Sequence, residues 1–422
     1  MDKIQCIKHK GGFLVLNLDT LLYKLVSAKQ MRLALSDINY MAELVAQLDG
    51  EPFQKRLAPY QEDELISVHL MPTYACNYRC SYCYQRERKQ ITGHMTPEYI
   101  PKIEDFYAEY NKAFKTSYKI NSVSVTGGEP FLPANRGIIG AILSLWKDKT
   151  VGFITNGAYV NYYRDLLLQH KSISLLFSVD GTKEIHYKKR IPSNADDYDV
   201  MLEGITWALS EGIETRITCL FYPEYIDSYP LFFDELAKRG WPDDPNFRVR
   251  FGLELHGAGS DAIDPTYLED ALTAFISLKK RDPRMQNVDT SSLLPGATEL
   301  EAALKCAEAN KTFYTGRCDA IIKPSYAFTP EGYVKVCSCV EGERGTVGQY
   351  WPEVEINVPR IKEVQKRRFD QLAACEKCVK RVFCMGGCFA TALAETGDLL
   401  GTHCGIWENP TFLKHLEDYW SL

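Results

Sequence analysis

Three cysteines, Cys76, Cys80 and Cys83, lie within the stretch ACNYRCSYCY. Three thiols cannot all be paired as disulfides within one stretch, and thiolates are ligands for zinc and for iron–sulfur clusters. Structural zinc sites usually take four ligands from CxxC pairs, whereas three thiolates can hold three irons of a four-iron cluster and leave the fourth iron open. The spacing CxxxCxxC therefore favours an iron–sulfur cluster with an open coordination position, with zinc as the alternative.

A second group of cysteines lies towards the end of the chain, because nine of the 14 cysteines fall between Cys306 and Cys404. In the run CEKCVKRVFCMGGC four cysteines are separated by two, five and three residues, and in GYVKVC a glycine, Gly332, stands five residues before a cysteine. Such clustering indicates further metal ligation. The group comprises Cys306, Cys318, Cys337, Cys339, Cys375, Cys378, Cys384, Cys388 and Cys404.

The whole chain has the composition of a globular protein. It has 422 residues, of which 45% are hydrophobic and 25% charged. The formal net charge of −6 argues against general nucleic-acid binding, which needs a basic face. No apolar run is long enough to span a membrane, and the start, MDKIQCIKHKGGF, lacks a secretory signal core. We therefore expect a cytoplasmic protein with no membrane or nucleic-acid partner, where clustered cysteines indicate metal or catalysis.

Six short apolar runs alternate with amphipathic segments between residues 65 and 285. This alternation predicts a parallel sheet with helical crossovers, and hence an α/β fold with a partial (β/α)6 TIM-type barrel. Chemistry in such barrels sits at the carboxyl ends of the strands. Polar and glycine clusters follow four successive runs, at residues 75–83, 126–130, 155–157 and 178–181.

The two ends of the chain differ from the barrel. Residues 1–64 predict a small α+β unit of two short strands followed by helices over 27–35 and 37–48. After about residue 286 the periodicity gives way to loops with glycine, cysteine and aromatic residues, which predicts a loop-rich C-terminal iron–sulfur domain. The expected domains are therefore 1–64, 65–285 and 286–422.

CxxxCxxC after the first predicted strand, followed by TGGEP after the second, resembles the radical S-adenosylmethionine (SAM) enzymes. In that family the open iron binds the amino and carboxylate groups of SAM, and one electron from the cluster cleaves the cofactor to a 5′-deoxyadenosyl radical that abstracts a substrate hydrogen. The resemblance implies that Cys76, Cys80 and Cys83 hold the SAM cluster. It also implies that SAM is contacted by Tyr82, Thr126, Gly127, Gly128 and Glu129, the last of which can neutralise the methionyl ammonium.

Two further strand ends fit the same resemblance. Ser178-Val179-Asp180-Gly181, followed by His186 and Arg190, is similar to a stretch of the family's peptide-modifying branch in which the serine and arginine contact the SAM carboxylate. An arginine fork suits a carboxylate. The implied SAM contacts therefore include Ser178, Asp180 and Arg190, and also Asn156 in the TNG turn.

The C-terminal cysteines resemble the SPASM (twitch-containing) domain, which binds two auxiliary four-iron clusters. The resemblance implies three [4Fe-4S] clusters in all. A distal auxiliary cluster would be held by Cys375, Cys378, Cys384 and Cys404, and a nearer one by Cys318, Cys337 and Cys388. The fourth ligand of the nearer cluster is Cys306, or the position stays open for a substrate thiolate. Cys339 is an alternative ligand or a spectator.

SPASM-bearing members act mostly on peptides and proteins, so the resemblance implies a peptide maturase of sactipeptide, ranthipeptide or related crosslinking type. We expect a thioether crosslink from a cysteine sulfur to carbon in a ribosomally made peptide. The alternatives are a carbon–carbon crosslink between aromatic or Lys/Arg side chains, and formylglycine formation of the sulfatase-maturase type. The stretch Cys337-Ser338-Cys339-Val340 lacks the acidic residue of the sulfatase enzymes and disfavours the last.

The partners implied are a precursor peptide and a flavodoxin- or ferredoxin-type reductant. Residues 1–64 resemble a shortened leader-peptide recognition unit, and a cap over the barrel edge is the alternative. The catalytic base is unknown, with Asp319 beside Cys318 as a guess. A non-enzymatic electron carrier is disfavoured because it has no use for a cofactor site with an open iron.

Overall fold

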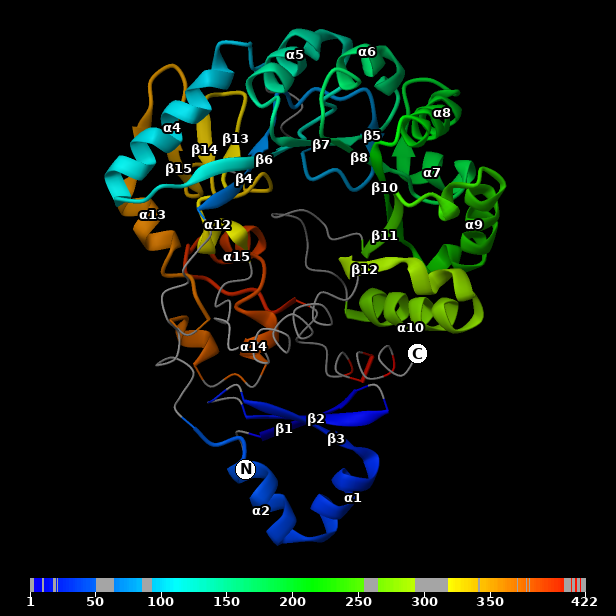
Figure 1. Cartoon of the computed structure of the whole chain (residues 1–422), viewed down its shortest axis with the longest axis vertical. Coiled ribbons are helices and arrows are strands. Elements are labelled where there is room, and N and C mark those ends of the chain that lie inside the picture. The colour runs from blue at the N-terminus through cyan, green and yellow to red at the C-terminus, as the bar shows by residue number, and fades with distance from the viewer. Residues whose placement is uncertain are drawn as a thin grey trace.

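The computed structural model describes residues 4–9, 11–17, 20, 22–50, 64–85, 93–253, 265–292, 318–340, 342–369, 371–376, 378, 380–405, 411, 414–415 and 418. Figure 1 shows these parts along the long axis of the molecule, with an arc of strands and helices at one end and a small N-terminal unit at the other. None of the helices found among these residues combines the length and apolarity that a membrane crossing needs.

Six parallel strands form the body of the large sheet, and each coincides with one of the six apolar runs of the sequence. Their order in the sheet follows the order in the chain, as expected when every crossover carries the chain to the next position. The predicted α/β partial barrel is therefore confirmed. The strands are β4 (Leu65–Leu70), β6 (Lys119–Val125), β7 (Thr150–Thr155), β8 (Ile173–Ser178), β10 (Glu214–Phe221) and β11 (Phe247–Leu253).

Helices cover the outer side of this arc (Figure 1). In α5 (Arg136–Leu145) the buried residues are Ile138, Ile139, Ile142 and Leu143, a spacing that gives the helix one apolar face towards the sheet. The other helices of this layer are α4 (Tyr99–Phe114), α6 (Arg164–Leu167), α8 (Asp197–Ser210), α9 (Tyr229–Lys238) and α10 (Pro265–Arg281), whereas the short α7 (Lys183–Lys189) lies at the carboxyl ends of the strands. Single 3₁₀ turns accompany them at η2 (Pro133–Asn135), η3 (Val160–Tyr163), η4 (Pro223–Ser228), η5 (Trp241–Asp243) and η6 (Pro283–Asn287).

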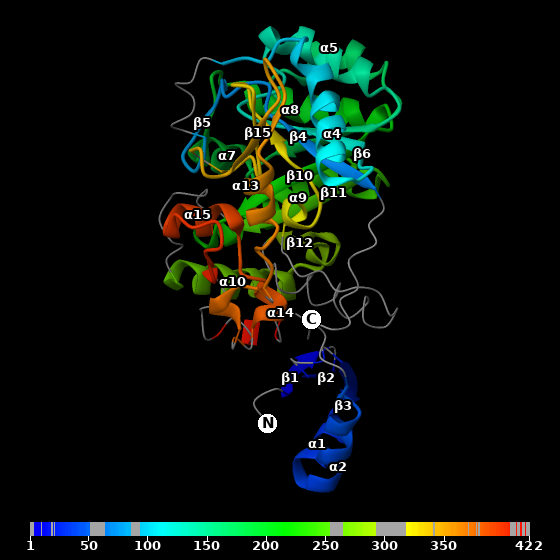
Figure 2. The same cartoon turned by 90° about the vertical axis from the view of Figure 1, so that its left-hand side faces the viewer.

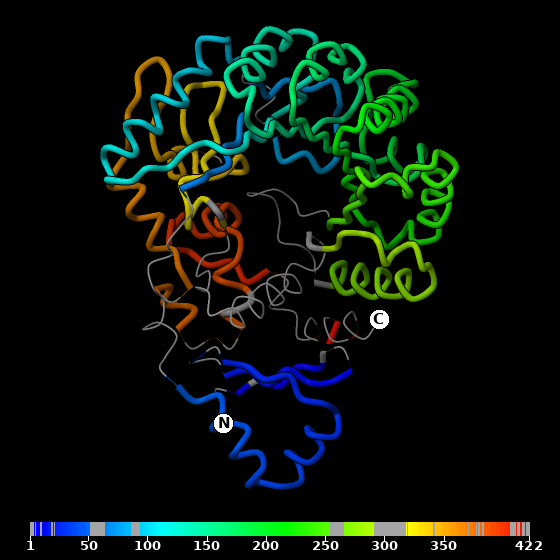
Figure 3. Tube along the Cα trace, viewed as in Figure 1, coloured from blue at the N-terminus to red at the C-terminus, as the bar shows by residue number. Residues whose placement is uncertain are grey.

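The sheet continues beyond the six strands at both edges and stays open, as the trace in Figure 3 shows. At one edge β12 (Asp289–Ser292) pairs with β11 in parallel. At the other edge β13 (Ala327–Phe328) pairs in parallel with β4, and three antiparallel strands follow it: β14 (Tyr333–Lys335), β15 (Thr346–Gln349) and β16 (Glu355–Ile356). Strands of two to four residues are too short for an alternating pattern, so no local pattern predicts this extension.

Short helices carry the chain from this extension into the second cysteine group. They are α12 (Asp319–Ile322), α13 (Val358–Val364), η7 (Ala373–Cys375), α14 (Arg381–Cys384) and α15 (Phe389–Thr396). In Figure 1 α15 lies on the inner side of the arc, and in both Figure 1 and Figure 2 α14 lies between α15 and the N-terminal unit.

The N-terminal unit has three antiparallel strands where the sequence predicted two. They are β1 (Ile4–His9), β2 (Gly12–Asn17) and β3 (Tyr23–Ser27), with β2 in the middle, followed by α1 (Ala28–Ser36) and α2 (Ile38–Ala46). Val15 of β2 packs in a small core with residues of α1 and α2, while its neighbours Leu14 and Leu16 belong to the main core. The two faces of β2 thus serve two different cores, because successive side chains of a strand point to opposite faces.

Candidate functional site

The loop that carries Cys76 and the TGGEP loop are joined backbone to backbone. The amide of Gly128 donates to the carbonyl of Thr73, 2.8 Å, and the amide of Glu129 donates to that of Ala75, 2.9 Å. A Cβ on Gly128 would lie 1.9 Å from the carbonyl oxygen of Ala75, and Gly127 has a φ of +118°. The glycines therefore let the second strand end approach the start of the cysteine loop, which a larger residue would prevent.

Glu129 is buried and its carboxylate is used to tie neighbouring strand ends together. Oε1 accepts from the amide of Phe131, 2.9 Å, and from the hydroxyl of Thr155, 2.7 Å, while Oε2 accepts from the amide of Asn156, 2.8 Å. Burial raises the pKa of Glu129 to about 7, against these three hydrogen bonds, which lower it. The sequence predicted Glu129 as a partner for the SAM ammonium. In the structure Glu129 also connects the end of β6 to the end of β7 by hydrogen bonds.

Asn156 connects the third strand end to the cysteine loop. Its Nδ2 donates to Oδ1 of Asn77, 2.8 Å, and lies 3.8 Å from the sulfur of Cys76. The amide of Tyr78 lies 3.3 Å from the same sulfur. Asn77 gave no signal in the sequence beyond its position between two of the three cysteines.

Tyr82, Asp180 and Arg190 form one polar group, in which Asp180 is buried and Tyr82 and Arg190 are partly buried. Burial raises the pKa of Tyr82, so its hydroxyl stays protonated and donates to Oδ2 of Asp180. Nη1 of Arg190 donates to the same hydroxyl, 2.7 Å, and lies 3.8 Å from Oδ2 of Asp180. Oδ1 of Asp180 accepts from the amide of Leu220, 3.0 Å. The structure thus brings together three of the predicted SAM-binding residues.

A two-stranded ladder places Arg190 beside the cysteine loop. β5 (Arg79–Cys80) pairs antiparallel with β9 (Arg190–Ile191), with Cys80 opposite Arg190. The thiols of Cys80 and Cys76 both act electrostatically on the guanidinium. Arg190 therefore places a positive charge next to the cysteines predicted to hold the SAM cluster, and its side chain is largely buried there.

His186 on α7 is buried behind Asp180. Its Nδ1 accepts from the amide of Asp180, 3.2 Å, which requires the neutral ring with the proton on Nε2. Burial lowers the pKa of His186, and the cation of Arg190 lowers it further. A neutral histidine at this position orients the backbone of the SVDG turn.

Several buried polar atoms around this group have no hydrogen-bond partner in the described part of the chain: Nδ2 of Asn77, Nε of Arg190 and Nε2 of His186. Buried donors of this kind are normally satisfied, so their presence at the strand ends beside three cysteines fits a bound polar cofactor. Thiolates, an arginine fork and backbone amides suit an iron–sulfur cluster that carries SAM.

The thiols predicted to hold the nearer auxiliary cluster come together from three elements. Cys318 precedes α12, Cys337 follows β14, and Cys388 precedes α15. Burial raises the pKa of Cys318 to about 11, the thiols of Cys388 and Cys337 raise it as well, and a hydrogen bond from the amide of Phe389 lowers it. The amide of Cys339 lies 3.4 Å from the sulfur of Cys337, so this extra cysteine borders the group.

The thiols predicted for the distal cluster form a second group. Burial raises the pKa of Cys375 to about 11, and the thiols of Cys378 and Cys404 raise it further. Cys384 ends α14 and is buried. Gly387 has a φ of +74°, and a Cβ there would lie 1.6 Å from the carbonyl of His403. This contact holds the Cys384–Cys388 loop against the segment that carries Cys404.

Some predicted residues have no assigned place. Cys306 lies outside the described residues, as does the side chain of Asp319, although its backbone begins α12. Ser178 ends β8, and Thr126 contributes its backbone amide to the carbonyl of Leu70, 2.8 Å. Within the described ranges no three His, Cys, Asp or Glu residues are arranged for a single metal ion. A cluster spaces its thiolates more widely than one ion, because its own irons and sulfides stand between them.

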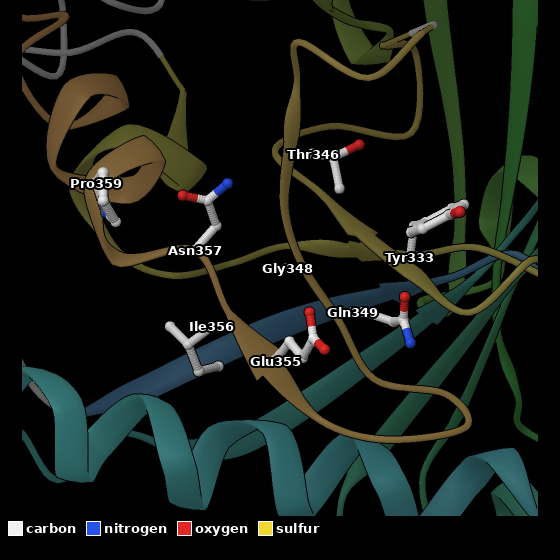
Figure 4. Close-up of a pocket in the computed structure, with 8 residues that line it drawn as sticks. All are labelled: Tyr333, Thr346, Gly348, Gln349, Glu355, Ile356, Asn357 and Pro359. Carbon is white, nitrogen blue, oxygen red and sulfur yellow. The ribbon is translucent and has the colours of Figure 1, made fainter.

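A hollow of about 400 Å³ lies elsewhere, on the sheet extension (Figure 4). It is lined by Tyr333, Thr346, Gly348, Gln349, Glu355, Ile356, Asn357 and Pro359. These residues come from β14 to α13, and none of them belongs to the strand-end loops or the cysteine groups. We assign no chemistry to it.

Residues 70–236 match the family model of the radical SAM superfamily. This segment is a radical SAM domain. The prediction of a radical SAM domain is confirmed by this match, which runs from the last residue of β4 into α9 and includes Cys76, Cys80 and Cys83. Sequence relatives include GTP 3′,8-cyclase of Staphylococcus epidermidis, 25% identical over 222 residues, and a probable GTP 3′,8-cyclase of Sulfurisphaera tokodaii, 29% identical over 150 residues. The matches cover 50% and 33% of this chain, and 59% and 42% of those enzymes.

The fold of this chain matches solved structures over a longer part of its length than the radical SAM domain alone. A structure of anSMEcpe with bound AdoMet and the Cp18Cys peptide has a TM-score of 0.61 at 16% identity, and covers 84% of this chain and 98% of that one. Streptococcus suis SuiB bound to its precursor peptide SuiA has a TM-score of 0.56 at 13% identity, and covers 94% and 96%. At such identities the likeness shows the fold alone. It extends on either side of the radical SAM domain.

Proposed function

We propose that this chain is a radical SAM maturase that forms a thioether crosslink, from a cysteine sulfur to carbon, in a ribosomally made peptide. The observation that carries the proposal is the presence of two further thiol groups behind a radical SAM domain, in a fold shared with two enzymes solved with bound peptides. GTP 3′,8-cyclase relatives cover at most half of this chain, so their substrate does not carry over to it.

The SAM cluster would be held by Cys76, Cys80 and Cys83. Arg190 would pair with the SAM carboxylate, and Tyr82 and Asp180 keep its guanidinium in position. Further SAM contacts would come from Thr126, Gly127, Gly128, Glu129, Asn156 and Ser178. The unpartnered buried atoms near these residues support a polar ligand at this place.

The auxiliary clusters would be held by the two thiol groups, with Cys318, Cys337 and Cys388 in the nearer set and Cys375, Cys378, Cys384 and Cys404 in the distal set. The cysteines that act electrostatically on Cys318 both belong to the first set, and those that act on Cys375 both belong to the second, which supports the division. Because cluster ligands are thiolates, loading both sites releases protons, among them those of Cys318 and Cys375, whose pKa values burial has raised.

A peptide would be captured by the N-terminal unit. Its sheet has β3 at an edge, where an extended peptide can add as a further strand. Leu25 of this strand is exposed on one face, whereas Val26 is buried on the other. An exposed edge strand with an apolar side chain supports a leader-binding role over a plain cap.

Crosslinking removes two hydrogens from the peptide: one hydrogen atom from carbon, one proton from the cysteine thiol, and one electron as the sulfur–carbon bond forms. The bound cofactors supply a hydrogen-abstracting radical and an electron acceptor, and a flavodoxin- or ferredoxin-type protein would supply the starting electron. The thiol proton needs a base on this chain, for which Asp319 beside Cys318 is the candidate from sequence. The chain's own part is to orient SAM through Arg190 and to exclude water around it.

The test is intact mass spectrometry of each small peptide encoded beside the gene, after anaerobic co-expression and with or without thiol alkylation. A peptide that loses two hydrogens and hides one cysteine from alkylation supports the thioether. Loss of two hydrogens with all thiols reactive overturns it in favour of a carbon–carbon crosslink. No change in any peptide points to a protein substrate and formylglycine formation.

Iron content tests the cluster assignment separately. The triple variant Cys76→Ala, Cys80→Ala and Cys83→Ala should lose SAM cleavage under dithionite and keep about eight irons, as two four-iron clusters require. A count near four or zero contradicts the two auxiliary clusters. Dithionite-dependent SAM cleavage by the wild-type protein excludes a simple electron carrier.

A further inference from the structure

Arg367 is a buried arginine three residues after the end of α13, and its guanidinium is held entirely by backbone carbonyls. Its side chain is 0% exposed. Nη2 donates to the carbonyl of Gly386, 2.8 Å, Nη1 to that of Gly387, 3.2 Å, and Nε to that of Gly401, 3.2 Å. The first two glycines lie between Cys384 and Cys388, and the third lies three residues before Cys404. One side chain therefore joins the two loops that carry thiols of both groups.

The charge of Arg367 has no carboxylate partner among the described residues. Its electrostatic neighbours include four thiols, two from each proposed cluster: Cys318 and Cys388, and Cys375 and Cys384. Its guanidinium also lies over the ring of Phe389, 5.6 Å from the centroid. Burying a cation without an opposite charge costs several kcal/mol, which is comparable to the whole free energy of unfolding of a domain. Among the described residues, the thiol groups are the ones that can supply the counter-charge, once they are ionised.

A purely structural role would require only the three hydrogen bonds, which a neutral side chain could make in part. A buried cation between two sets of thiolates does more than this. It stabilises additional negative charge nearby, and the attraction is strong because the surroundings exclude water. A reduced iron–sulfur cluster carries one more negative charge than the oxidised one, so a fixed neighbouring cation favours the reduced form.

We propose that Arg367 is the shared counter-cation of the two auxiliary clusters, a positioning residue that holds their ligand loops together and raises the reduction potential of both. This inference rests on the two auxiliary clusters of the proposed function. A raised potential suits a cluster that accepts the electron released when the crosslink forms.

The experiment compares three substitutions, each made in the full-length protein that carries Cys76→Ala, Cys80→Ala and Cys83→Ala, so that only the auxiliary clusters give signals. Arg367→Gln removes the charge, and Arg367→Lys keeps it but cannot reach all three carbonyls. Arg360→Gln is the matched control, because Arg360 lies on α13 in the same region and pairs with Glu363 near the surface, 3.9 Å. The iron content of each variant is measured. The midpoint potential of each auxiliary cluster is then determined by a redox titration that is monitored by electron paramagnetic resonance.

In Arg367→Gln we expect both midpoint potentials to fall. At a fixed potential the ratio of reduced to oxidised cluster should be at least tenfold lower, which corresponds to a fall of about 59 mV for a one-electron couple. Arg367→Lys should stay closer to the parent, and Arg360→Gln should not differ from it. Loss of iron in Arg367→Gln but not in Arg367→Lys supports the same inference.

Unchanged potentials in an iron-replete Arg367→Gln overturn the inference. Equal loss of iron from Arg367→Gln and Arg367→Lys overturns it as well. Either result would show that the positive charge at position 367 has no effect on the clusters. A parent variant that does not hold about eight irons contradicts the proposed auxiliary clusters themselves, before Arg367 is changed.

Discussion

Cys80 and Arg190 stand opposite each other in a two-residue antiparallel ladder, although 110 positions separate them in the chain. The ladder brings a guanidinium to the cysteine loop by backbone hydrogen bonding. Tyr82 then receives a hydrogen bond from Nη1 of Arg190 and donates one to Asp180, so the arginine is fixed at both ends of its side chain. This relationship is what makes the end of β8 part of the candidate SAM site.

Arg190→Lys should weaken SAM binding about tenfold or more, roughly 1.4 kcal/mol, because a lysine keeps the charge but loses the planar fork. The dissociation constant measured by equilibrium dialysis on the iron-loaded protein tests this. Lys189→Gln is the control, since the ammonium of Lys189 lies over the ring of Tyr222, 3.9 Å away, outside the Tyr82–Asp180 group. Equal SAM affinity in Arg190→Lys and wild type contradicts the assignment.

Glu129 should make the stability of the protein depend on pH. Burial raises its pKa from 4.5 to about 7, so between these pH values the folded state binds a proton that the unfolded state has released. The stability that this protonation contributes is fully present below pH 4.5 and is lost as the pH rises through 7, by up to about 3 kcal/mol.

Urea unfolding of the reduced apo-protein at pH 5 to 9 measures this effect against Glu129→Gln, which does not titrate. The Gln variant is expected to be less stable at every pH, because its amide cannot accept from the amide of Asn156 as Oε2 does. The difference in unfolding free energy between the two proteins should shrink as the pH rises to 8. A difference that stays flat contradicts the raised pKa.

Gly128→Ala should separate the TGGEP loop from the cysteine loop, since its Cβ would lie 1.9 Å from the carbonyl oxygen of Ala75. We expect loss of the SAM cluster, about four of twelve irons, and a lower melting temperature. Gly137→Ala is the matched control: nothing lies within 4 Å of its Cβ, and alanine in α5 should stabilise by about 0.5–1 kcal/mol. The iron content and the melting temperature of both variants test this prediction. An unchanged iron content in Gly128→Ala would contradict the close contact between Gly128 and Ala75.

Gly387→Ala should release the segment that carries Cys404. Its Cβ would lie 1.6 Å from the carbonyl of His403, and its φ is +74°. Gly342→Ala separates the two effects, because Gly342 has a φ of +65° with open space around it. Iron counts should fall by about four in Gly387→Ala and stay near twelve in Gly342→Ala. A similar loss of iron in both variants would mean that the backbone strain of a positive φ, and not the clash with the carbonyl of His403, removes the cluster.

The elements of the barrel were predictable because each has a local signal. The six strands are apolar runs of five or more residues, and α4, α5, α8 and α9 have the spacing of an apolar face. The strands β13 to β16 were not predictable, because they are two to four residues long and because β13 joins them to the sheet through β4, from a distant part of the chain. The third strand of the N-terminal sheet was missed for a related reason, since its apolar residues merge with those of the preceding loop.

The sequence by itself predicted the kind of chemistry, because the spacing of the thiols in one loop, and of the glycines and the acid in another, is local and is not changed by folding. It thereby singled out Cys76, Cys80, Cys83 and the TGGEP segment as the candidate site. Only the tertiary structure decided which distant groups meet: Arg190 with Cys80, Glu129 with Thr155 and Asn156, and Arg367 with two thiol groups. Such contacts depend on sheet order and register, which bring together residues far apart in the chain, and no local pattern records them.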